Sequence, residues 1–97
     1  ACLEIEAAIY EHPSVREASV FGIPDERLGE KLATRISLNP GAELSEEDLS
    51  SFLAAKIAKF KIPEYTWFQA EELPKVAAGK IAKKQMREDA IKELGLD

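Results

Sequence analysis

VREASVFGIPDERLGEKLATRISL, running from Val15 to Leu38, is the stretch that decides the fold. The part up to Ile23 is strand-like, and Pro24-Asp25 then marks a turn. From Leu32 to Leu38 apolar and polar side chains alternate with a period of two, which is typical of a half-buried strand. The stretch therefore predicts two strands separated by a turn.

Helical patterns lie on both sides of these strands. Upstream, apolar positions recur at i, i+3, i+4 and i+7 up to Pro13, which ends the helix. Downstream, Ser45-Glu46-Glu47-Asp48 resembles a capping box and predicts a second helix. One face of the first helix should carry Ile5, Ala8 and Ile9, with His12 as a surface or helix-end residue, and one face of the second Leu49, Phe52, Leu53, Ile57 and Phe60.

The last third of the chain adds one strand and one helix. Residues 65–70 form a short strand pattern, and a helix is expected from about Lys80 to Leu94, with Gly95 as its stop. The predicted order is helix, strand, strand, helix, strand, helix. It corresponds to an α+β fold in which a small three-stranded sheet is packed by helices, as one domain over residues 1–97.

Composition narrows the class of protein. With 45% hydrophobic and 32% charged residues the chain is typical of a globular domain, and no apolar run approaches the roughly 20 residues of a transmembrane helix. Cys2 is the only cysteine, which excludes an internal disulfide and a cysteine-based zinc site. We expect no metal site in this chain, no transmembrane segment and a cytoplasmic location.

Charge is distributed unevenly. Residues 1–55 hold four basic and eleven acidic residues, a net of −7, whereas residues 56–97 hold nine and seven, a net of +2. An acidic chain lacks the basic face that nucleic-acid binding requires, so no nucleic-acid partner is expected. The second half could still bind a small anion such as a phosphate, or its lysines could simply be solvated.

Lys80 is the candidate for such chemistry. It follows the flexible Ala77-Ala78-Gly79 at the start of the predicted last helix, where a mobile ammonium, exposed backbone N–H groups and the positive helix end would suit a phosphate or carboxylate. The alternative is an ordinary exposed lysine on a loop. Ala78-Gly79-Lys80 lacks the upstream glycine and the following hydroxyl of a P-loop.

The ordered motifs of the chain are similar to those of the C-terminal domain of the adenylate-forming superfamily, which includes acyl- and aryl-CoA ligases, peptide-synthetase adenylation domains and luciferases. The likeness covers nearly the whole chain, and the G-K-I-x-K ending favours the CoA-ligase branch. The segments that carry it are Glu4-Ile5-Glu6, Tyr10 to Val15, Val20 to Asp25, Gly29-Glu30, Pro40-Gly41-Ala42, Leu44 to Leu49, Lys59 to Pro63, Leu73-Pro74-Lys75 and Gly79 to Lys83.

This resemblance implies a role for Lys80. The matching lysine reaches the ATP site of a larger N-terminal domain, where it contacts the carboxylate being activated and the nucleotide, and Gly79 supports its loop. The parent would use ATP, CoA and a small-molecule carboxylic acid as substrates, with Mg²⁺ bound by the N-terminal domain. The abrupt start at Ala1 is read as a missing N-terminal domain and hinge, so the fragment alone is expected to be inactive.

After adenylation the family rotates this domain, and another face then helps to bind CoA. Arg27, Lys59 and Lys61 are the candidate CoA-binding residues, with solvated surface charge as the alternative for each. The chain departs from the family at Val76 and Ala78, where hydroxyl residues usually help to hold the lysine loop. Two other functions stay open: an adenylation domain that loads a carrier protein, and a free-standing module that binds a phosphorylated ligand.

Overall fold

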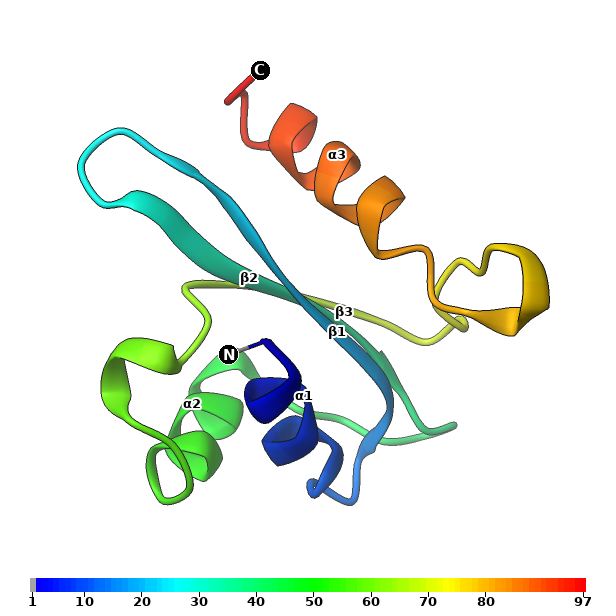
Figure 1. The fold of residues 1–97 in the computed structure, drawn as a ribbon. Helices are drawn as coiled ribbons and strands as arrows, with labels where there is room; N and C mark the ends of the chain where they lie inside the picture. The colour runs from blue at the N-terminus through cyan, green and yellow to red at the C-terminus, as the bar shows by residue number, and fades with distance from the viewer. Residues whose placement is uncertain (1) are drawn as a thin grey trace.

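The computed structural model describes residues 2–97, and Ala1 lies outside the described residues. The elements are α1 (Cys2–Tyr10), β1 (Val15–Asp25), β2 (Gly29–Leu38), α2 (Glu46–Ala54), β3 (Tyr65–Gln69) and α3 (Lys83–Glu93), with the 3₁₀ turns η1 (Lys59–Lys61) and η2 (Ala77–Gly79). This order confirms the predicted α+β fold (Figure 1).

The three strands form one mixed sheet in the order β1-β2-β3. β1 and β2 are an antiparallel hairpin paired from Val15 opposite Leu38 to Asp25 opposite Gly29. β3 runs parallel to β2, with Ala33 opposite Tyr65. A parallel neighbour needs a long crossover, and the segment that contains α2 and η1 supplies it.

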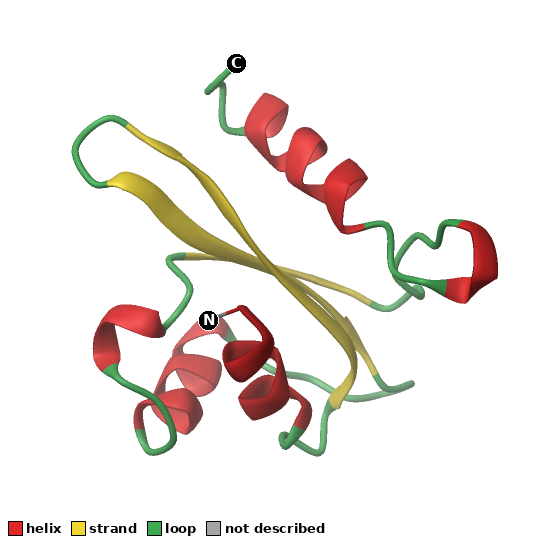
Figure 2. Cartoon of the chain, in the orientation of Figure 1, coloured by secondary structure: helices red, strands yellow, loops and turns green. Residues whose placement is uncertain are grey.

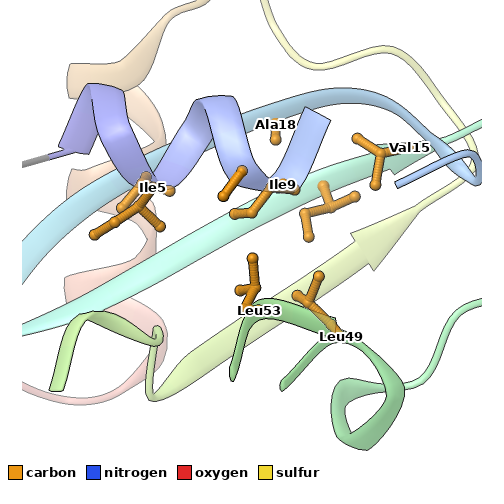
Figure 3. Close-up of a cluster of buried hydrophobic side chains, with 9 residues drawn as sticks. Ile5, Ile9, Val15, Ala18, Leu49 and Leu53 are labelled. Carbon is orange, nitrogen blue, oxygen red and sulfur yellow. The ribbon is translucent and has the colours of Figure 1, made fainter. Parts of the chain in front are cut away.

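Helices cover both faces of the sheet. Figure 2 shows α1 and α2 on one side and α3 on the other. The face under α1 and α2 carries the larger cluster of buried side chains, shown in Figure 3: Ile5, Ala8, Ile9, Val15, Ala18, Val20, Ile36, Leu49 and Leu53. The face under α3 carries Phe21, Ile23, Ala33, Leu73, Met86 and Ala90. The period-two pattern of β1 and β2 thus divides the apolar residues between two clusters.

The outer edge of β1 is closed by side chains rather than by another strand. An edge strand presents unpaired backbone groups that can pair with another chain. Here helices on both faces supply the partners: the Tyr10 hydroxyl bonds to the N–H and the C=O of Ala18 at 3.0 and 3.3 Å, Glu6 accepts from the Val20 N–H at 2.7 Å, and Arg87 Nε donates to the Gly22 carbonyl at 2.7 Å.

Two predicted helices have different bounds in the structure. The second helix was expected to continue to Phe60, but α2 ends at Ala54 and Ala58 has extended backbone (φ −63°, ψ 145°). Ile57 still packs against the core, whereas Phe60 is 82% exposed on η1. The placement of Phe60 on the buried helix face was therefore wrong.

The last helix begins later than the sequence indicated. α3 starts at Lys83 with Ala82 as its N-cap, and Lys80 has extended backbone (φ −77°, ψ 142°). Lys80 is therefore not at a helix N-terminus, and the positive end of a helix dipole does not act at its position. His12 likewise falls beyond α1, where its ring packs edge-on against Phe52 at 4.8 Å between centroids. No helix in residues 2–97 has the length and apolar character needed to cross a membrane.

Candidate functional site

Lys80 lies in a closed loop of residues 74–82, which we call the lysine loop. Backbone hydrogen bonds tie its two arms together: the Val76 N–H donates to the Lys80 carbonyl at 2.7 Å, and the Ala82 N–H donates to the Pro74 carbonyl at 2.8 Å. Lys75 and Ile81 form an isolated antiparallel bridge between these two bonds. The backbone of Lys80 is thus held although Val76 and Ala78 provide no hydroxyl groups.

The tip of the lysine loop turns through two successive left-handed residues. Ala78 has φ 66° and Gly79 has φ 74°. Glycine adopts this region without a steric penalty, whereas an alanine there costs roughly 1–2 kcal/mol. The Gly79 N–H donates to the Val76 carbonyl at 3.2 Å and closes the turn. The tight reversal explains why a small-residue run precedes Lys80.

The Lys80 side chain is exposed at the end of this turn. Two other lysines near it in sequence make ion pairs: Lys75 with Glu17 at 2.6 Å, and Lys83 with Glu6 at 2.7 Å. Within residues 2–97 the Lys80 ammonium has neither an ion-pair partner nor a hydrogen bond. It is therefore the cation of the lysine loop that can bind an anion without first breaking a contact.

The Lys75–Glu17 pair changes the proton affinity of both groups. Burial alone would raise the pKa of Glu17, but hydrogen bonds from the Lys75 ammonium and the Leu73 N–H outweigh it, so the pKa lies below its ordinary value. The hydrogen bond with Glu17 raises the pKa of Lys75. Both groups are therefore charged at neutral pH, and the pair fixes the entry of the lysine loop to β1.

The three candidate CoA-binding residues lie in two separate segments. Lys59 and Lys61 share η1, whereas Arg27 lies in the turn between β1 and β2. Figure 1 shows these segments apart from each other, and both on the side of the molecule away from η2. The structure therefore groups two of the three residues and places all of them at a distance from Lys80.

Lys61 is partly engaged already. Its ammonium bonds to Glu4 at 2.8 Å, and this hydrogen bond lowers the pKa of Glu4. Phe60 lies between the two lysines with its ring 82% exposed, and the Lys61 ammonium is 5.8 Å from the ring centroid. Sequence reasoning did not consider Phe60 as a candidate surface residue because the apolar spacing assigned it to the core. Its position between Lys59 and Lys61 is the signal in the sequence that could have indicated exposure.

Two surface hollows in the described chain are lined by other residues than these candidates. One surface hollow of about 340 Å³ is lined by Glu43, Leu44, Ser45 and Asp48, and another of about 210 Å³ by Arg35, Gln69, Pro74, Met86 and Asp89. Residues 2–97 hold no group of three or more metal-ligating side chains.

Comparison with known proteins identifies relatives of the whole domain. The family described as the AMP-binding enzyme C-terminal domain matches residues 4–80, so Lys80 is the last residue of the match. The chain is 40% identical over 93 residues to the mitochondrial medium-chain acyl-CoA ligase ACSF2 of Danio rerio, covering 96% of this chain and 15% of that protein. It is 37% identical over 86 residues to a long-chain-fatty-acid–CoA ligase of Bacillus subtilis, covering 89% and 15%.

Solved structures agree with these relatives. Apo and ATP-bound crystal structures of MatB from Rhodopseudomonas palustris superpose with TM-scores of 0.86 and 0.84 at 32% identity, covering 96% and 95% of this chain and 18% of MatB. The chain spans less than a fifth of the length of the ligases and structures that it matches.

Proposed function

Because the chain belongs to the AMP-binding enzyme C-terminal domain family, we propose that it is the mobile C-terminal domain of an ATP-dependent carboxylic acid–CoA ligase. The observation that carries the proposal is Lys80, an exposed and unpaired cation on a closed loop at the end of the family match. The ATP and acyl pockets then belong to a larger N-terminal domain of the same polypeptide.

In the first step the substrate carboxylate attacks the α-phosphorus of ATP. A bond forms between a carboxylate oxygen and that phosphorus, the bond to the β-phosphate bridging oxygen breaks, and pyrophosphate leaves. Two anions must approach each other, and negative charge builds up between them. The Lys80 ammonium orients both groups and offsets this charge, a contribution worth roughly 10²–10³ in rate. Gly79 supports this role by allowing the left-handed turn before Lys80.

In the second step the thiol sulfur of CoA attacks the acyl carbonyl carbon and a carbon–sulfur bond forms. The bond from that carbon to the phosphate oxygen breaks, AMP leaves and the thiol proton is released to solvent. We propose that the domain rotates between the steps, which withdraws Lys80 and presents the distant face that holds η1. Lys59 and Lys61 suit the phosphates of CoA, and the exposed Phe60 ring offers a stacking surface for its adenine. Arg27, on its separate turn, is a further contact for this anionic ligand.

Mg²⁺ enters this scheme with ATP and is held by the N-terminal domain. The cytoplasmic location stays a prediction, since a matched relative is named as mitochondrial. The identity of the carboxylic acid depends on the N-terminal domain, and the matched ligases are named for medium-chain and long-chain acids.

The test is acid-dependent ATP–pyrophosphate exchange by the full-length protein, across a panel of carboxylic acids. Lys80→Ala should lower exchange roughly 10²–10³-fold. Lys84→Ala removes another exposed lysine, four residues along on α3, and should leave exchange unchanged. Equal effects of the two variants would contradict the assignment of Lys80.

A separate experiment tests whether CoA or a carrier protein accepts the acyl group. With the acid found in the exchange assay, thioester formation on CoA should have a higher KM for CoA in Phe60→Ala and Lys61→Ala. Thioester formation on a carrier protein but not on CoA would instead support the carrier-loading alternative. Binding of ATP by the 97-residue chain alone would support a free-standing phosphate-binding module.

A further inference from the structure

Two glutamates hold the two ends of the lysine loop. At the entry, the Glu17 carboxylate accepts hydrogen bonds from the Leu73 N–H at 2.8 Å and from the Lys75 ammonium at 2.6 Å. At the exit, one oxygen of Glu6 accepts from the Val20 N–H and from the Lys83 ammonium, both at 2.7 Å. Each carboxylate therefore joins a lysine at one end of the lysine loop to the framework of the domain, Lys75 just inside the loop and Lys83 just after it.

These contacts differ from ordinary surface ion pairs. An exposed pair contributes little because water screens it and both side chains lose freedom. The side chains of Glu17 and Glu6 are only 17% and 15% exposed, and each also bonds to a backbone N–H that fixes its orientation. Partial burial and a second donor make both carboxylates fixed anchors for their lysines.

We propose that Glu17 and Glu6 are positioning residues that hold the lysine loop in the geometry required for adenylation. The inference rests on the proposed function of Lys80. Because Lys80 has a long side chain and no partner within the described chain, the backbone of the loop decides where its ammonium can reach. A misplacement of about 1 Å can cost roughly 10²-fold in rate.

Glu17 has the shorter connection to the catalytic lysine. Lys75 precedes Val76, whose N–H donates to the Lys80 carbonyl at 2.7 Å. Release of Lys75 should therefore loosen the first arm of the lysine loop, whose Val76 N–H is hydrogen-bonded to the Lys80 carbonyl. Because Lys80 acts in adenylation and is withdrawn for thioester formation, loss of either anchor should slow the first step and spare the second.

The experiment separates the two steps in the full-length protein. ATP–pyrophosphate exchange measures adenylation, and thioester formation from a synthetic acyl-adenylate and CoA measures the second step. Glu17→Gln and Glu6→Gln should each lower exchange roughly ten- to a hundredfold and change thioester formation less than about twofold. The matched control is Glu11→Gln, which breaks a 2.9 Å pair with Lys56 outside the lysine loop and should change neither step.

If Glu17→Gln and Glu6→Gln slow pyrophosphate exchange and thioester formation equally, the two glutamates are merely structural and the proposal is overturned. Unchanged pyrophosphate exchange in these variants would overturn it as well. If Glu17→Gln fails to fold, Lys75→Met gives the same test, because it leaves Glu17 bonded to the Leu73 N–H.

Hydrogen exchange of residues 74–82 on the same proteins distinguishes this inference from the proposed function. Faster exchange in Glu17→Gln than in Glu11→Gln is expected. If the wild-type protein shows no pyrophosphate exchange with any acid, the proposed ligase function is overturned. If Glu17→Gln leaves the hydrogen-exchange protection of the lysine loop unchanged, the positioning role of Glu17 is overturned, whether or not the protein is a ligase.

Discussion

Replacing Gly79 by alanine adds one methyl group to a left-handed residue at the tip of the lysine loop. The added Cβ would meet no heavy atom within 4 Å, so the cost is conformational rather than steric crowding. At φ 74° that cost is roughly 1–2 kcal/mol. Alanine also restricts the unfolded chain, which offsets about 0.4–1 kcal/mol. We expect a net loss of roughly 1 kcal/mol in the free energy of unfolding.

The effect on the lysine loop should exceed the effect on global stability. Relative to other loop conformations, the full penalty of about 1–2 kcal/mol applies, which changes their population by roughly 5–30-fold. Adenylation in the pyrophosphate exchange assay should therefore fall, by at most a similar factor, because activity follows the fraction of protein with the native loop. Gly41 provides the matched control, because it has φ 77°, its Cβ would also meet nothing within 4 Å, and it lies in the turn after β2.

Urea unfolding and pyrophosphate exchange should be measured on both variants. Gly79→Ala and Gly41→Ala should lose similar stability, while only Gly79→Ala loses adenylation. If both variants lose adenylation equally, the activity follows domain stability and the reasoning on loop geometry is refuted. If Gly79→Ala keeps full activity, the turn before Lys80 is not needed to place its ammonium.

Three further outcomes are expected. The lowered pKa of Glu17 means that its contribution to stability is present above its ordinary value of 4.5 and is lost as the pH falls through the folded pKa, so Glu17→Gln should flatten the acid side of a urea stability profile. The raised pKa of Lys75 gives the opposite case: its contribution is present below the ordinary value of 10.5 and is lost as the pH rises through the folded pKa, so Lys75→Met should flatten the alkaline side. In urea unfolding at pH 7, Leu53→Ala should cost about 2–5 kcal/mol because Leu53 is fully buried, whereas Phe60→Ala should stay within roughly 0.5 kcal/mol; a large loss in Phe60→Ala would contradict its exposure.

Short-range patterns were sufficient for the hairpin and for the order of elements. The alternation from Leu32 to Leu38 lies within β2, which begins three residues earlier, and the boundary at Pro13 follows α1 closely. The turn was misplaced, because Pro24 and Asp25 still pair with β2 at the end of β1. The direction of β3 relative to β2 could not be predicted. The two strands pair in parallel, and this pairing depends on the crossover through α2, which no local pattern encodes.

The start of the last helix was misjudged at a place where the sequence held a warning. Ile81 and Met86 are five residues apart, which does not fit one helix face, whereas Met86 and Ala90 fit it at i, i+4. The left-handed Ala78 had no such signal, because alanine favours helices. The end of α2 was also unmarked, since no glycine or proline occurs between Ala54 and Phe60.

The sequence indicated Lys80 as a candidate through the resemblance of the motifs, and its role stays a prediction. The contacts of Glu17 with Lys75 and of Glu6 with Lys83 join residues far apart in sequence and form only through tertiary packing. An isolated glutamate in a strand or helix gives no sign of such a partner.

The side chains that close the outer edge of β1 also determine how copies of this domain can associate. Tyr10, Glu6 and Arg87 occupy backbone groups of Ala18, Val20 and Gly22 that a neighbouring molecule would otherwise use, which hinders intermolecular strand pairing at these positions. Within the described residues, β3 is the other border of the sheet, and it is five residues long. Among the described residues, pairing of this sheet with another copy of the domain is thereby confined mainly to one short edge, the five residues of β3.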